Sequence, residues 1–136
     1  MLIDSHCHLD RLDLTPFDGE LANALSFAKE RGVERFLCVA IDMENVHTVI
    51  DIAQTHPEIY ASVGVHPNER EHGEPTVEEL VELAANDKVI AIGETGLDYF
   101  RSEGDLAWQH QRFRNHIAAA RACDKPLIIH CREARD

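Results

Sequence analysis

The stretch KVIAIGETGLDYF, residues 88–100, places an acidic side chain directly after an apolar run. The run KVIAIG, residues 88–93, is typical of a strand buried on both faces of a parallel sheet. Glu94 follows at once, between Gly93 and Gly96. Packing explains this glutamate poorly, because an unpaired carboxylate is costly to bury. We therefore expect Glu94 to bind a cation, the alternative being a glutamate turned to solvent in a glycine-rich turn.

Four further strand-like runs recur along the chain, at 2–8, 35–41, 59–65 and 126–131. Apolar residues at helical spacing predict helices between them, over 18–31, from near 42 to before 57, from 76 onward and over 105–123. Thr76 and Glu79 have the T-x-x-E spacing of a helix capping box. The resulting order βαβαβαβαβ favours a parallel sheet covered by helices.

Two parallel architectures fit this order, an open doubly wound sheet and a (β/α)8 barrel. The absence of GxGxxG and of a P-loop weakens the nucleotide-binding open sheet. Ionisable residues instead gather after the strand-like runs, where barrel enzymes carry their active sites; they are His6, His8, His66, Glu94 and His130. We therefore predict an α/β TIM-barrel-like fold, with residues 1–136 forming a single domain.

The histidines around Glu94 offer a set of metal ligands. In an extended strand Asp4, His6 and His8 share one face, so two imidazoles converge. His130 ends an apolar run, where a buried, hydrogen-bonded histidine is the common case, although neutral imidazole is also the commonest metal ligand. Taken together, three histidines and one glutamate suit zinc, manganese or a similar divalent ion.

His66 follows its strand and precedes Pro67, which keeps it extended at the mouth of a barrel. It is expected to bind substrate, donate a proton or cap a turn. We expect the remaining histidines to be surface groups; they are His47, His56, His72, His110 and His116.

The composition limits the function in a different way. The 136 residues include 25 acidic and 13 basic side chains, a net charge of −12 that opposes non-specific attraction to nucleic acid or an anionic membrane. The amino terminus lacks the pattern of a signal peptide, and no apolar run approaches the ~18 residues of a membrane span. These features predict a cytoplasmic protein with no membrane partner, whose four cysteines are free thiols.

Four ordered motifs resemble the TatD family of metal-dependent deoxyribonucleases. They are DSHCHLD (4–10), SVGVHP (62–67), AIGETGLDY (91–99) and PLIIHCREA (126–134). The resemblance covers almost the whole chain and implies a (β/α)8 barrel with up to two divalent metal ions, Mg, Mn or Zn. It implies that His6 and His8 hold one ion, that Glu94 bridges both, and that His130 contributes to the second.

The resemblance also implies an activity, the hydrolysis of DNA phosphodiester bonds, often from the 3′ end, by two-metal activation of water. Glu94 and His66 would be the catalytic residues, and His66 and Arg132 would lie near the substrate phosphate. The main alternative is a related barrel hydrolase that acts on a non-nucleic-acid ester, amide or phosphoester, because fold and ligands do not choose the substrate.

A (β/α)8 barrel takes about 250 residues, so this chain is expected to supply about five strands and four helices of one. The family's further histidine and aspartate ligands have no counterpart in these residues. Three interpretations follow: an amino-terminal portion of a complete hydrolase, a natural half-barrel that pairs through its open edges with another copy or a separate second half, or a non-catalytic protein that binds metal loosely. We favour the first.

Overall fold

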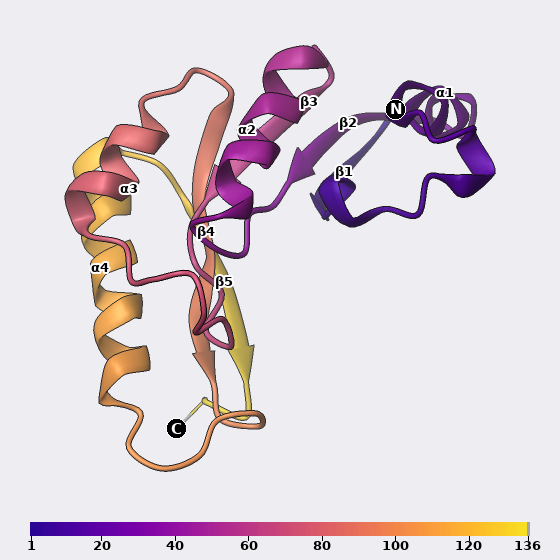
Figure 1. The fold of residues 1–136 in the computed structure, drawn as a ribbon. Coiled ribbons are helices and arrows are strands. Elements are labelled where there is room, and N and C mark those ends of the chain that lie inside the picture. Colours follow the sequence, from indigo (N-terminus) through magenta and orange to yellow (C-terminus); the bar gives the residue numbers. More distant parts are fainter. Residues whose placement is uncertain (136) are drawn as a thin grey trace.

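The computed structural model describes residues 1–135, and Asp136 lies outside the described part. Residues 1–135 form a five-stranded parallel sheet with four helices (Figure 1). The strands are β1 (Leu2–Cys7), β2 (Val33–Cys38), β3 (Ile59–Val63), β4 (Val89–Asp98) and β5 (Leu127–Arg132). The helices are α1 (Leu21–Glu30), α2 (Asn45–Thr55), α3 (Val77–Ala84) and α4 (Ala107–Cys123).

The order of the strands decides between the two parallel architectures. The sheet runs β1-β2-β3-β4-β5, and every neighbouring pair is parallel. A doubly wound sheet would reverse its order at a switch point, whereas a sequential order with right-handed crossovers places the helices on one face. Here α1 packs against β2, α2 against β3, and α3 and α4 against β4. The sheet is a curled half-barrel, so the predicted barrel-type fold is confirmed.

Burial is uneven across this sheet. The core lies between α2 and the central strands, where Val46, Val49 and Ala53 meet Ile59 and Ala61, all fully buried. The two edge strands are open by contrast: Leu2 and Ile3 of β1 are each 61% exposed, and Ile129 of β5 is 58% exposed. These are the edges at which further strands would continue a barrel.

Local signals account for several of the observed element ends. The predicted capping box is present at the start of α3, where the Glu79 N–H donates to Thr76 Oγ1 (3.1 Å) and the Thr76 N–H donates to Glu79 Oε2 (2.7 Å). Gly32 follows α1 with a φ of +88°, the left-handed conformation that ends many helices. No helix among residues 1–135 is long and apolar enough to cross a membrane.

The spacing of Leu106, Phe113, Ile117 and Ala120 in the sequence predicts an apolar stripe along α4, and the observed packed face differs from it. Its fully buried side chains include Gln109, Arg112 and His116, whereas Phe113 and Ile117 are only partly buried. The prediction that His116 is a surface group is therefore wrong. Its ring is bonded on both sides, to the Val65 N–H (2.9 Å) and to the Arg112 carbonyl (2.8 Å), and such pairing makes the burial of an imidazole tolerable.

Candidate metal centre

The candidate functional residues lie at one end of the sheet, where the carboxyl ends of the parallel strands meet. Gly96 of β4 pairs with His130 of β5. Its φ is +143°, and a Cβ at this position would lie 2.0 Å from the His130 carbonyl oxygen. Only glycine tolerates both conditions. Gly96, two residues after Glu94, thus lets β4 and β5 lie close together, with the Glu94 carboxylate and the His130 imidazole within reach of each other.

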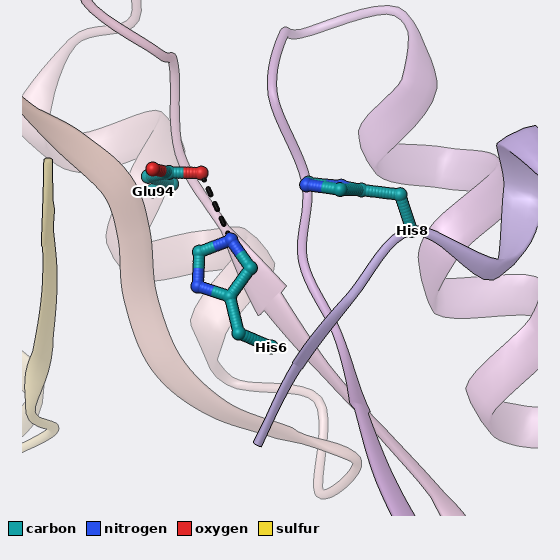
Figure 2. Close-up of side chains that lie close together, drawn as sticks. All are labelled: His6, His8 and Glu94. Atoms are coloured by element: carbon teal, nitrogen blue, oxygen red, sulfur yellow. Dashed lines mark ion pairs between the residues drawn. The ribbon is translucent and has the colours of Figure 1, made fainter. Parts of the chain in front are cut away.

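The first candidate ligand group comes from β1 and β4. His6 Nε2 lies 3.1 Å from Glu94 Oε2, and the His8 ring points toward the same space (Figure 2). His8 Nδ1 lies 2.9 Å from the Val39 carbonyl, which can only accept, so Nδ1 carries the proton and Nε2 keeps its lone pair. One ligand atom from each of His6, His8 and Glu94 falls within 4.8 Å of the others.

The second group uses the other oxygen of the same carboxylate. His130 Nδ1 lies 3.2 Å from Glu94 Oε1 and 3.2 Å from His66 Nε2. These three residues also offer ligand atoms within 4.8 Å of one another. Glu94 therefore lies between two imidazole groups, with one oxygen toward each.

The environment of His66 determines which of its nitrogens carries a proton. The Asn68 N–H donates to His66 Nδ1 at 3.1 Å, so a neutral His66 has its proton on Nε2. Burial lowers the pKa of His66 and outweighs the nearby charge of Glu94, which keeps the ring neutral at neutral pH. His66 consequently presents an N–H donor, and not a ligand lone pair, toward His130 Nδ1 (3.2 Å) and Glu94 Oε1 (3.9 Å). His130 and Glu94 are therefore the candidate ligands of the second group.

Asp98 is a residue of this site that the sequence analysis missed. It is fully buried at the end of β4, and its Oδ2 lies 2.8 Å from His130 Nε2 and 2.9 Å from Asn68 Nδ2. Burial acts to raise the pKa of Asp98, but hydrogen bonds from the Arg101 N–H, Asn68 and His130 outweigh it and lower the pKa to about 2. The signal in the sequence is the alternation of Glu94, Gly96 and Asp98 along one strand face.

A pocket of about 330 Å³ opens beside these residues. Two positively charged side chains, those of Arg11 and Arg101, line this pocket. The other lining residues are His8, Ile41, His66, Asn68, Glu69 and Glu94. Arg132 is placed elsewhere: its guanidinium lies 3.8 Å from the centre of the Phe100 ring and lines a separate pocket with Tyr99 and Cys131. The structure thus gathers the predicted histidines and Glu94, and leaves Arg132 apart from them.

The donor set fits divalent metal ions. Nitrogen and carboxylate oxygen ligands suit zinc and manganese, and ligand atoms bound at about 2.1 Å to one ion lie roughly 3–4 Å apart. The separations of up to 4.8 Å are close to that range. Asn68 Oδ1, buried beside the site, has no hydrogen-bond partner among the described residues, as expected for a polar centre with room for an additional ligand such as water.

Comparisons with known proteins identify the family of this chain. Residues 3–136 match the family described as TatD related DNase. The chain belongs to this family. It is 38% identical to the uncharacterized metal-dependent hydrolase YcfH of Escherichia coli K12, over 98% of this chain and 50% of that protein. It is 29% identical to the 3'-5' ssDNA/RNA exonuclease TatD of Edwardsiella piscicida, over 87% of this chain and 46% of that protein.

A solved TatD homologue confirms the fold. The crystal structure of YjjV from Escherichia coli K12 superposes with a TM-score of 0.81 at 32% identity, covering 96% of this chain and 51% of YjjV. The family resemblance drawn from the four motifs is thereby confirmed. The chain spans about half the length of the curated relatives that it matches.

Proposed function

We propose that this chain carries the metal-binding part of a metal-dependent hydrolase of the TatD family, and that the enzyme cleaves phosphodiester bonds of DNA. One observation carries the proposal: the two oxygens of Glu94 face two separate imidazole groups, as a carboxylate that bridges two ions would. The family membership and the name of the Edwardsiella exonuclease support the nucleic-acid substrate.

Different residues have different roles in the proposed chemistry. His6, His8 and His130 would hold divalent ions together with Glu94, and such ions activate water and stabilise negative charge on a phosphate oxygen. His66 keeps its proton on Nε2 and lines the pocket; with an ion on His130 Nδ1, this N–H would be free to donate to an oxygen of the substrate. Its role is therefore in substrate binding and proton donation.

The positive side chains of the pocket suit an anionic substrate. Arg11 and Arg101 line it, which supplies locally the attraction that a chain of net charge −12 lacks overall. We propose that Arg132 contacts DNA further along the strand, from the separate pocket that it lines with Tyr99. A related hydrolase acting on a neutral ester or amide is the second candidate, and it would gain nothing from the two arginines.

The open edges of the sheet support a proposal about partners. The exposed Leu2 and Ile3 on one edge and Ile129 on the other lie where further strands would pair. We propose that the second half of a barrel covers both edges, supplied by the same polypeptide or by a separate chain. The half-length match to the relatives supports this arrangement.

Metal uptake and hydrolysis test the proposed function together. We expect the chain to bind Mn²⁺ or Zn²⁺, and the complete barrel that contains it to cleave single-stranded DNA only with metal present and not with EDTA. Glu94→Gln should abolish both, because it removes the group shared by the two sites, whereas Glu78→Gln on the exposed face of α3 should change neither. Failure of the wild-type chain to take up metal would contradict the proposal. Metal-dependent cleavage of amides or carboxylic esters alone would favour the second candidate.

A further inference from the structure

We propose that Asp98 is a positioning residue of the metal centre, which holds the proton of His130 on Nε2 and so turns the lone pair of Nδ1 toward Glu94. The inference rests on the proposed metal centre and adds to it a residue that acts through His130. Its evidence is the direction of each hydrogen bond around the buried carboxylate.

Two hydrogen-bond partners of the Asp98 carboxylate are N–H donors, so its oxygens act as acceptors. Its Oδ2 receives a hydrogen bond from Asn68 Nδ2 (2.9 Å), and its Oδ1 receives one from the Arg101 N–H (3.0 Å). Amide and peptide N–H groups are always donors. His130 Nε2, at 2.8 Å from Oδ2, therefore donates as well. A neutral imidazole protonated on Nε2 has its lone pair on Nδ1, the atom 3.2 Å from Glu94 Oε1.

The Nδ1 lone pair of His130 lies 3.2 Å from Glu94 Oε1 and 3.2 Å from the protonated Nε2 of His66. A cation placed between Nδ1 and the carboxylate oxygen would be bound by both, so the proton position set by Asp98 suits metal ligation by His130 Nδ1. Carboxylate–histidine–metal arrangements of this kind orient the ring and raise its basicity, and the loss of the carboxylate typically weakens metal binding 10–100-fold.

Asp98 is itself held in place by α4. Gln109, which is fully buried, accepts from the Asp98 N–H at 3.0 Å and contacts the Asp98 and Pro67 carbonyl oxygens, each at 3.3 Å. One side chain of α4 thus ties the end of β4 to the loop after β3. Arg112, three residues along the same helix, donates to the carbonyl oxygens of His66 (2.7 Å) and Glu69 (2.5 Å). Both imidazoles of the second group are therefore positioned from one helix.

Replacing Asp98 with asparagine distinguishes positioning from a purely structural role. The introduced amide fills the same space, and its oxygen stays on the Arg101 N–H, a backbone donor that cannot turn round. Its NH₂ group then faces Asn68 and His130 Nε2; the Asn68 amide can turn its Oδ1, which has no partner among the described residues, toward this group. The ring must respond by accepting at Nε2 and moving its proton to Nδ1, where it blocks the metal-binding atom. Asp42→Asn is the matched control, because Asp42 is also buried at this edge but accepts from backbone N–H groups at the start of α2.

The experiment measures the tautomer of the neutral His130 ring by ¹⁵N NMR in the metal-free chain, at a pH above the one at which the ring loses its second proton, and the affinity for Zn²⁺ by titration. The His130 signals are assigned by their loss in His130→Gln. We expect an Nε2–H tautomer in the wild-type chain and in Asp42→Asn, and an Nδ1–H tautomer with 10–100-fold weaker Zn²⁺ binding in Asp98→Asn. An unchanged tautomer and affinity in Asp98→Asn would overturn the inference.

Two further outcomes separate this inference from the proposed function. An Nδ1–H tautomer in the wild-type chain overturns the role of Asp98 without any variant, so the test survives a variant that does not fold. A wild-type chain that binds no Zn²⁺ contradicts the metal centre, whereas a tautomer that switches in Asp98→Asn would still support the action of Asp98 on His130.

Discussion

The two ligand groups that share Glu94 are built in different ways. The first depends on β1, an edge strand on which the side chain of His6 is 41% exposed. The second is set among β3, β4 and β5, where the His130 side chain is 20% exposed and is bonded to the buried Asp98. Both groups include an edge strand, β1 or β5, but in the second group the ligand His130 is also bonded to a buried side chain outside the group, that of Asp98.

The difference shows what a buried polar helix face contributes to a site. Gln109 and Arg112 of α4 bond to backbone groups near Asp98 and His66, and they replace apolar packing with contacts that fix position and direction. No helix packs against β1 in the same manner, since α1 packs on β2 among the described residues. Substitutions in the second group should therefore lower the free energy of unfolding, whereas substitutions in the first group should mainly weaken metal binding.

Gly96→Ala should have the largest effect on the free energy of unfolding, because it disrupts the contact between β4 and β5. The new Cβ would meet the His130 carbonyl at 2.0 Å, and the φ of +143° is strained for alanine. Strain and overpacking together should lower the free energy of unfolding by about 4 kcal/mol or more, measured by urea denaturation. Gly104→Ala is the control: its φ is +81° but the space around it is open, so about 1 kcal/mol is expected. Equal effects would show that the close approach is not rigid.

Lowering the pH should weaken the α4 side of the site through His116. Burial lowers the pKa of His116 from 6.5 to about 4, so the unfolded chain binds a proton between these values that the folded chain does not. The free energy of unfolding should fall by about 3 kcal/mol from pH 7 to pH 4, with no contribution from this residue above pH 7.

His116→Gln isolates this effect, because the variant retains an acceptor for the Val65 N–H and the other titrating groups are common to both chains. The measurement is the difference between the two urea-unfolding profiles across this pH range. Parallel profiles would show that His116 is not buried in its neutral form.

Much of the fold and half of the site follow from the sequence, for identifiable reasons. Apolar runs and helical spacing located all five strands and four helices, and strand ends located His6, His8, Glu94 and His130. Asp98 was missed because the apolar run stops at 93, whereas β4 continues to Asp98 through polar residues paired with β5.

The buried face of α4 was missed for a related reason. Hydrophobic periodicity selects apolar side chains such as Phe113 and Ile117, but Gln109, Arg112 and His116 are buried because their partners lie on other elements. Those partners are mostly backbone groups, whose positions no spacing within a single helix reveals. The buried, hydrogen-bonding face of such a helix is thus the part of a site that is hardest to predict from one sequence.

The smallest expected effect, that of His6→Ala, provides the most direct contrast with His130→Ala. In the metal-free chain His6→Ala should change the free energy of unfolding by no more than about 0.5 kcal/mol, since the side chain is exposed on an edge strand. His130→Ala should cost about 1–3 kcal/mol, because it removes a partner of the buried Asp98. Both should weaken Zn²⁺ binding, so urea unfolding and metal titration of the same two variants separate folding from ligation. Equal losses of stability would mean that β1 is as firmly organised as β5, and the contrast between the two groups would then reduce to exposure alone.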